Sequence, residues 1–232
     1  DFIGTYKNFL IALGVYKTGA HFENMVKWSS QADPGGVPFT WNEADPTNSA
    51  GEANLQGGGS IKCGAKLKDS YIIYKDSSVT TMNYVGGDFI FSLRQLFDDI
   101  GIINKGCVQE FDGNHFVVGR GDVYVHNGVQ KKSVITGKMR NFLFTSIRSD
   151  AADRTHVIAD HNNTSMWICF CSTRTNVGAS NKGCDLALIW DWSTDLWALR
   201  EIPYTRFGTF GVVDPKTSDA WDDDTEVWST DT

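Results

Sequence analysis

Short runs of β-branched and aromatic residues alternate with polar turns along most of this chain. The clearest run, residues 71–74, leads through the polar turn 75–78 into a second run at 79–85. The same order of parts returns at residues 115–118 and 123–125. Apolar runs of this length, bounded by Gly, Asp, Asn and Ser, are typical of strands joined by hairpin turns. The pattern therefore predicts antiparallel β-sheet.

The hairpin units recur at a long and somewhat irregular period. A looser copy pairs residues 166–171 with 186–192, and equivalent positions lie 44 residues apart from Tyr71 to His115 and 51 apart from His115 to Met166. Four-stranded propeller blades repeat every ~40–50 residues, whereas sandwich turns recur every ~8–12 residues without a higher repeat. We therefore expect an all-β fold of β-propeller blades. The expected units are 5–45, 61–97, 107–136 and 155–203, with a further unit starting at 207–232.

The remaining segments complete this picture. Strands are expected at residues 9–16, 25–29, 61–67, 71–75, 79–85 and 89–93, and a Pro/Gly/Asn-rich loop is expected over 30–59. One short helix is predicted at residues 138–147, because Met139, Phe142 and Leu143 follow the i, i+3, i+4 spacing of a helix face.

Composition indicates a globular domain with a substantial core. Hydrophobic residues make up 41% of the 232 positions, so disorder is not expected for most of the chain. No apolar run reaches the ~18 residues that a membrane span needs, so we expect no membrane insertion by this segment. The first residues carry no initiator Met and no basic leader, and the last ones resemble an unfinished strand pattern. We expect the sequence to be part of a longer polypeptide.

Five cysteines form no C-x-x-C pair. Cys169 and Cys171 are two apart on a predicted strand, so their side chains share a face, which suits either a metal or core packing. No histidine lies at zinc-ligand spacing from them, so core packing of reduced thiols is the favoured interpretation. No metal or other cofactor is expected.

The net charge of −7 argues against a protein that grips nucleic acid, which normally presents a basic face. Passing contact with DNA is compatible with this charge, because like charge repels a polyanion and keeps it from sticking. Acidic residues gather near the C-terminus, at Asp214, Asp219, Asp222, Asp223, Asp224 and Glu226.

Three segments, in their order, resemble one family. They are Val26-Lys27-Trp28-Ser29, followed by Ala32-Asp33-Pro34 and Trp41; residues 71–78, followed by 82–87 and 89–91; and residues 187–192, followed by Trp197. Together they are similar to the nozzle, or tail tubular protein B-like, components of short-tailed bacteriophages, over most of residues 26–203.

The resemblance implies a structural protein without catalytic activity. Members of that family contain a propeller and form a sixfold ring below the portal and adaptor, where they line the channel through which the genome leaves. The expected partners are therefore copies of this chain in a hexamer, the portal or adaptor, other tail proteins and, in passing, viral DNA. The expected location is the tail of the virion, after assembly in the host cytoplasm.

Two sets of residues are candidates for these roles. Asp222, Asp223, Asp224 and Glu226 are the candidate channel or rim residues, since an acidic wall leaves DNA few cations to hold. A solvated acidic turn is the simpler interpretation of the same residues. The polar loops 30–59 and 173–183 are candidate subunit contacts, because loops on a rigid scaffold carry interactions.

The alternative is a carbohydrate-binding or sialidase-like β-propeller. Eight tryptophans could form a sugar platform, and Ser30, Asp33 and Trp41 approach the Asp-box of sialidase propellers with one residue too many. A sialidase would need an arginine cluster that is missing here, so the lectin form of this alternative is the one that stays open.

Several other patterns have simpler explanations. Asp98 and Asp99 are expected to be solvated turn residues rather than a glycosidase pair. Residues 120–122 spell Arg-Gly-Asp where a tight hairpin turn belongs. Asp222, Asp224 and Glu226 lack the rest of a calcium loop. The five histidines are scattered without a nucleophile motif, so no catalytic triad is predicted.

Overall fold

A computed structural model of the chain describes residues 1–87, 89–173 and 183–205. Within these residues, sixteen strands form four antiparallel sheets of four strands each. Every sheet is a meander, since its strands follow one another both in sequence and in space. The predicted all-β class, with antiparallel blade-like sheets and a short helix, is confirmed.

Each sheet takes a continuous piece of the chain. The first sheet consists of β1 (Phe2–Tyr6), β2 (Phe9–Lys17), β3 (Ala20–Trp28) and β4 (Gly51–Asn54). The second consists of β5 (Ile61–Leu67), β6 (Ser70–Lys75), β7 (Val79–Tyr84) and β8 (Phe91–Phe97). The third consists of β9 (Val108–Phe111), β10 (Asn114–Val118), β11 (Val123–His126) and β12 (Lys131–Ser133). The fourth consists of β13 (His156–Asp160), β14 (Ser165–Phe170), β15 (Cys184–Asp191) and β16 (Leu196–Thr205).

The described helices lie between the third and fourth sheets in the sequence. They are α1 (Gly137–Ser146) and a 3-10 helix, η1 (Ser149–Arg154). The first confirms the predicted helix with its start and end one residue earlier, and Leu143 from the predicted apolar face is buried in the core. The second was not predicted, because its sequence, Ser-Asp-Ala-Ala-Asp-Arg, has no apolar face to reveal it. No helix among the described residues is long and apolar enough to cross a membrane.

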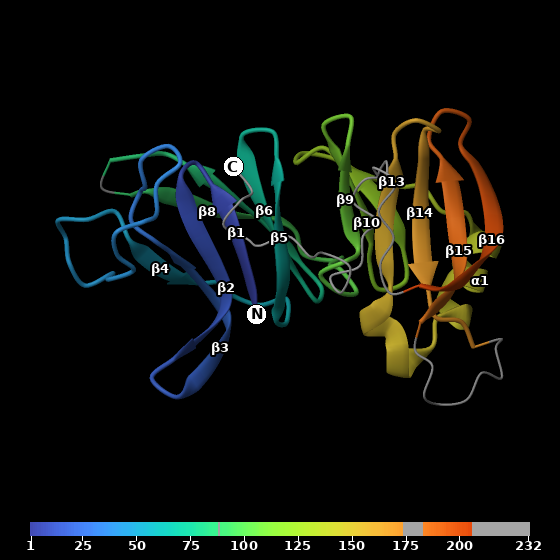
Figure 1. Cartoon of the computed structure of the whole chain (residues 1–232), viewed down its shortest axis with the longest axis horizontal. Coiled ribbons are helices and arrows are strands. Elements are labelled where there is room, and N and C mark those ends of the chain that lie inside the picture. Colours follow the sequence, from blue (N-terminus) through green and yellow to red (C-terminus); the bar gives the residue numbers. More distant parts are fainter. Residues whose placement is uncertain (88, 174–182, 206–232) are drawn as a thin grey trace, which may run out of the picture.

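The four sheets stand side by side in the order of the sequence, with the first and the last at opposite ends (Figure 1). β5 lies against the first sheet, and β13 lies against β9. One apolar core fills the space between the first and second sheets, and a larger one extends from the second sheet through the third to the fourth. The described sheets therefore form an open row, with no closed barrel.

Strand β6 shows how an alternating sequence serves two cores. Tyr71 and Ile73 point into the core shared with the first sheet, while Ile72 and Tyr74 point into the core shared with the third. Successive side chains of a strand point to opposite faces, so a strand covered on both sides must be apolar at every position. This is why β6 is an unbroken run of large buried residues.

Two strand predictions need correction. The predicted loop 30–59 contains β4, which has no β-branched or aromatic residue to signal it. It forms because Gly51 lets the backbone approach the Trp28 ring, from which an added Cβ would lie only 2.5 Å. The last strand of the second sheet begins at Phe91 instead of residue 89, after a turn in which Gly86 and Gly87 both have positive φ.

The sheets can be set against the four predicted units. The first sheet covers residues 2–54 instead of 5–45, since β1 starts near the beginning of the chain and β4 lies beyond the predicted end. The other three sheets begin and end within a few residues of 61–97, 107–136 and 155–203. The unit expected to start at 207–232 lies outside the described residues.

Candidate functional site

A large cavity lies at the end of the molecule where the first strand of each sheet begins. Its volume is about 870 Å³, and its walls include Asp1 beside β1, Ile61 at the start of β5, Ile103 ahead of β9 and Ala152 ahead of β13. Pockets of roughly 300–1,000 Å³ are of the size that small ligands occupy. Residues at or ahead of the first strand of all four sheets therefore line one cavity.

Two cations that line this cavity, Lys62 and Arg120, share one carboxylate that is not itself among the lining residues. Asp76, in the hairpin turn after β6, lies 3.3 Å from the Lys62 ammonium and 2.5 Å from the Arg120 guanidinium. Ser60 donates to the same carboxylate from its backbone N–H at 3.0 Å and its hydroxyl at 2.7 Å. Burial alone would raise the pKa of Asp76, but the hydrogen bonds from Ser60 and the charge of Lys62 hold it below its ordinary value.

The remaining walls carry charges of both signs. Lys105 is exposed and makes no ion pair among the described residues, and Glu23 is exposed on the opposite side. Asp1 faces His21 with Oδ2 and Nε2 2.9 Å apart. Exposed charges attract one another weakly in water. The cavity can therefore hold a polar ligand by several weak contacts, but it presents no concentrated anion site.

Nucleophilic chemistry has little support in this arrangement. Ser60 lines the cavity, but its hydroxyl donates to Asp76 and accepts from the Lys62 ammonium at 2.8 Å. The hydroxyl thus bridges the start of β5 to the turn after β6. A serine nucleophile needs a general base that accepts the hydroxyl proton while the oxygen attacks a substrate. Here the hydroxyl donates to Asp76, a carboxylate that is already paired with two cations.

One cysteine–histidine pair lies near the other side of this end. Cys184 Sγ is 3.8 Å from Nδ1 of His156 and 3.4 Å from the carbonyl oxygen of Arg154. Burial raises the pKa of the Cys184 thiol to about 12, so the sulfur stays protonated near neutral pH. This pair is a packing contact and does not supply a thiolate.

The other cysteines behave in the same way. All five thiols are buried and free. Burial raises the pKa of Cys63 to about 12 and that of Cys169 to about 11. The described residues contain no group of three or more His, Cys, Asp or Glu side chains arranged to hold a metal ion. The cysteines take the packing role that the sequence favoured.

The predicted channel residues cannot be placed. Asp222, Asp223, Asp224 and Glu226 lie outside the described residues, as does most of the loop 173–183. The loop 30–59 is described, and Glu43 within it forms ion pairs with Lys17 and Lys27 of the first sheet. These pairs lower the pKa of Glu43 to about 2, chiefly through the hydrogen bond from Lys17.

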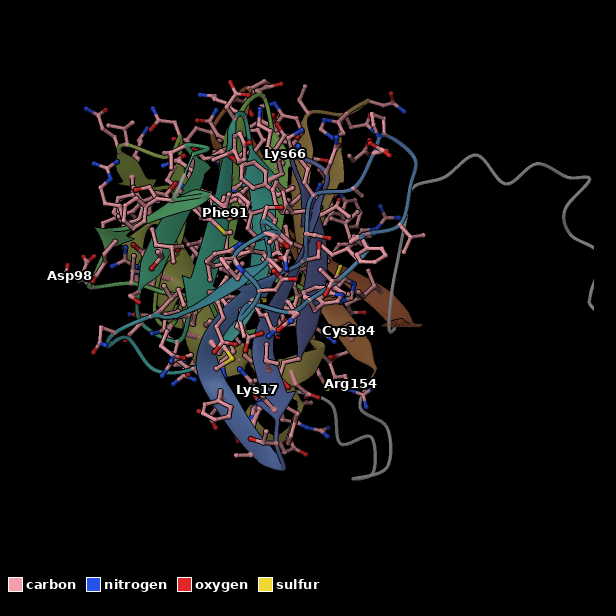
Figure 2. The ribbon with its side chains drawn as sticks, turned by 90° about the vertical axis from the view of Figure 1, so that its left-hand side faces the viewer. Lys17, Lys66, Phe91, Asp98, Arg154 and Cys184 are labelled. Atoms are coloured by element: carbon pink, nitrogen blue, oxygen red, sulfur yellow. The ribbon has the colours of Figure 1, made fainter. Side chains whose placement is uncertain are left out.

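Asp98 and Asp99 are exposed in the turn after β8, as expected for solvated turn residues. Asp99 pairs with the Lys131 ammonium. In Figure 2, Asp98 lies at the margin of the molecule, far from Lys17 and Arg154 at the end where the cavity opens. These two carboxylates do not contribute to the cavity.

The Arg-Gly-Asp sequence forms the hairpin turn between β10 and β11. Gly121 has a φ of +92°, which favours glycine, and the N–H of Gly119 donates to the carbonyl of Asp122 at 2.9 Å. The Asp122 carboxylate accepts from the Arg140 guanidinium at 2.8 Å. The turn thus binds its neighbours on both sides, and Arg120 contributes to the cavity wall already described.

Tryptophans pack between strands and sheets. Trp190 stacks on Phe116 with ring centroids 5.4 Å apart, and Trp28 meets Phe91 edge-on at 5.3 Å. None of the six tryptophans in the described residues is exposed, while Trp221 and Trp228 lie outside them. The near-match to an Asp-box is a loop closed by two bonds: the N–H of Ser30 donates to the carbonyl of Thr40 at 2.8 Å, and the Ser30 hydroxyl accepts from the N–H of Thr40 at 3.1 Å.

No pattern in the sequence predicted the cavity. Its wall includes Ser60, Lys62 and Arg120, which come from two sheets, lie up to 60 residues apart and share the Asp76 carboxylate as a partner. A carboxylate in a hairpin turn is the commonest of turn features. A sequence-based prediction of the cavity would have needed to know that the first strands of the four sheets begin at the same end of the molecule.

Comparison with known proteins identifies no family. No protein-family model matches the sequence, and no curated protein matches it. Among solved structures, a point mutant of Synechocystis apocarotenoid oxygenase is similar, with 8% sequence identity and a TM-score of 0.38. The match covers 83% of this chain and 45% of the oxygenase chain, so this chain spans less than half of that protein. A likeness at this level carries no inference about fold or activity.

Proposed function

We propose that this chain is a structural subunit of the tail nozzle of a short-tailed bacteriophage, in which copies associate into a ring around the genome-ejection channel. Its neighbours in that setting are other copies of the chain, the portal or adaptor and other tail proteins, with viral DNA in passing contact. Sixfold symmetry is what the sequence resemblance implies. The virion tail is its location, after assembly in the host cytoplasm.

The observation that carries this proposal is the open row of four sheets. The outer face of the first sheet and the outer face of the fourth point in opposite directions and differ in sequence (Figure 1). A ring requires two different complementary patches on each subunit, whereas a twofold dimer requires one patch that pairs with itself. A row of sheets with two unlike ends fits the first requirement.

The positions of the family-like segments support a structural function. They fall largely on β3, on β6 and β7, and on β15, and Trp28, Tyr71, Tyr74 and Trp190 within them pack in the cores, whereas Tyr84 and Phe89 are exposed. Trp190, for example, stacks on Trp197 of the next strand with centroids 6.2 Å apart. These segments maintain the blades, which is the task of a scaffold.

The carbohydrate-binding alternative receives no comparable support. A sugar platform needs tryptophan faces that are open to solvent. The six described tryptophans are buried or half-buried, and none of them lines the large cavity. A sugar soak that produced a bound ligand at this chain would favour the alternative.

The decisive experiment is electron microscopy of the native particle, together with mass photometry of the purified chain. Ile3 is 61% exposed on the outer face of the first sheet, and Val129 is 76% exposed in a turn of the third. Replacing Ile3→Asp should weaken ring formation, while Val129→Asp serves as the matched control at an equally exposed apolar site. A chain that stays monomeric at every concentration and is missing from tailed virions would refute the proposal.

A further inference from the structure

Three buried side chains connect the second sheet to the third. The hydroxyl of Tyr74 on β6 lies 2.7 Å from Nδ1 of His115 on β10 and 2.6 Å from Nε2 of His126 on β11. Tyr74 and His115 have no exposed surface, and His126 is 1% exposed. We name these three residues the tyrosine–histidine joint.

The neighbours of the joint fix the position of every proton. Nδ1 of His126 lies 3.2 Å from the backbone N–H of Gly128, which can only donate, so the proton of His126 is on Nε2 and points at Tyr74. Nε2 of His115 lies 2.9 Å from the carbonyl oxygen of Lys66, which can only accept, so this nitrogen carries the proton. Nδ1 of His115 is then the acceptor for the Tyr74 hydroxyl. The series runs in one direction from Gly128 to Lys66, with both imidazoles neutral.

An additional proton has no place in this series. A proton on Nδ1 of His126 would face the N–H of Gly128, so that two donors would meet. A proton on Nδ1 of His115 would face the Tyr74 hydroxyl, which would lose the acceptor for its own proton. A buried donor without an acceptor is unfavourable, and more so when it is charged. Protonation of either histidine therefore breaks the joint.

The residues around the joint offer the imidazoles little compensating charge. Burial, together with the neighbouring His115, lowers the pKa of His126 to about 3. Burial also lowers the pKa of His115, against the opposing effects of the Lys66 carbonyl and the charge of Glu110 on β9. Glu110 is exposed to solvent, so water screens its attraction.

The other titratable groups near the joint are neutral or already paired. Tyr124 on β11 stacks on His126 with centroids 5.9 Å apart, and burial raises its pKa above the ordinary range. Cys63 on β5 stays protonated for the same reason. Phe97 at the end of β8 packs edge-on against His126, and its ring lies under the Lys131 ammonium, which pairs with Asp99.

We propose that the tyrosine–histidine joint is an acid-sensitive connection between the second and third sheets, which opens when either imidazole takes up a proton while the sheets themselves stay folded. In the open state each imidazole meets water and binds a proton near its ordinary pKa of ~6.5. The closed joint holds fewer protons, so its advantage is complete above that value. It is lost progressively as the pH falls from ~6.5 towards the lowered pKa of the closed state.

The size of the effect follows from this linkage. Between pH 7 and pH 5, the equilibrium constant for opening should rise about 25-fold through His126, which titrates near pH 6.5 only in the open state. His115, whose pKa is also lowered by burial in the closed state, should increase this ratio further.

Hydrogen–deuterium exchange of the full chain at pH 7 and pH 5 measures this directly, with rates corrected for the intrinsic effect of pH. Amides of β6, β10 and β11 should lose protection at pH 5 by at least about 25-fold, while those of β14 keep theirs. In His126→Gln, whose amide can still donate to Tyr74 but does not titrate, the loss should be about 25-fold smaller. His161→Gln removes an exposed histidine and should behave as the unchanged chain. Equal loss in every sheet, or equal loss with and without His126, would overturn the proposal.

Side-chain nitrogen NMR of the unmodified chain tests the proton positions in the joint independently, because it does not require any variant to fold. Both His115 and His126 should carry their proton on Nε2 and should not titrate near pH 6.5 while the joint is closed. A proton on Nδ1 of either residue, or ordinary titration of either in the closed state, would contradict the proposed arrangement.

Discussion

Tyr71 and Tyr74 offer a matched pair for testing the hydrogen bonds between sheets. Both lie on β6, both are buried, and they point to opposite faces of the second sheet. The Tyr74 hydroxyl has two hydrogen-bond partners, His115 and His126, whereas the Tyr71 hydroxyl has none among the described residues. The same change, Tyr→Phe, therefore removes two hydrogen bonds at one position and no hydrogen bond at the other.

The two variants should shift stability in different directions. Tyr74→Phe leaves Nε2–H of His126 and Nδ1 of His115 buried without partners, and each such group is unfavourable by about 1–3 kcal/mol. We expect a loss of about 3 kcal/mol in the free energy of unfolding. Tyr71→Phe removes a hydroxyl that was buried without compensation, so stability should stay the same or rise by up to about 1 kcal/mol.

Thermal and urea unfolding followed by circular dichroism measure the difference. For a chain of this size, about 3 kcal/mol corresponds to a fall of roughly 6–12 °C in Tm. The two variants lose the same atom and differ only in its surroundings, so their comparison cancels the general effect of a smaller side chain. If both fall by the same amount within about 0.5 kcal/mol, the joint adds nothing to stability and the reasoning is wrong.

Three further predictions concern other parts of the fold. In Gly64→Ala the new Cβ would lie 2.4 Å from the Tyr71 ring, so the free energy of unfolding in urea should fall by about 1–3 kcal/mol. In the control, Gly137→Ala, the new Cβ would meet nothing within 4 Å, so this change should be neutral or slightly stabilising. Equal losses in the two variants would refute the argument. A thiol reagent at pH 8 should label none of the described cysteines in the native chain, and all of them after denaturation. These are Cys63, Cys107, Cys169, Cys171 and Cys184. Rapid labelling of the native chain would show that they are not buried. The folded pKa of Glu43 is lowered to about 2, so the stabilisation from its ion pairs is complete above the ordinary pKa of ~4.3 and decreases as the pH falls below that value. The loop 30–59 should therefore become more sensitive to limited proteolysis at pH 3, and in Glu43→Gln at pH 7. Unchanged cleavage in both would contradict this.

The blades were predictable from local sequence because their signals are local. A run such as residues 71–85 contains both strands and the turn of a hairpin, so the pattern needs no information from elsewhere in the chain. Strand β4 escaped detection because it depends on a distant partner: Gly-Glu-Ala-Asn becomes a strand only beside the open edge of β3, where Gly51 fits against Trp28. The propensity of a short edge segment is overridden by its surroundings.

The joint and the cavity were beyond prediction for a related reason. His115 and His126 are 41 and 52 residues from Tyr74, and each occupies a strand position that an apolar residue could fill equally well. A single histidine in a strand does not indicate in the sequence which residue it contacts. Its partner depends on which faces of two sheets pack together. That information appears only once the sheets are stacked, and stacking is a property of the whole row.

The two faces of β6 connect the second sheet to its neighbours in different ways, one by apolar packing and the other by hydrogen bonds to histidines. Towards the first sheet, Tyr71 and Ile73 pack among apolar and aromatic groups. Towards the third sheet, Tyr74 depends on two imidazoles that must both stay neutral. Apolar packing responds little to protons, whereas a neutral buried histidine is destabilised wherever the unfolded or open state gains a proton. A single strand therefore divides the row into a part that keeps its geometry over a wide pH range and a part whose geometry depends on pH, and the division lies between the second and third sheets.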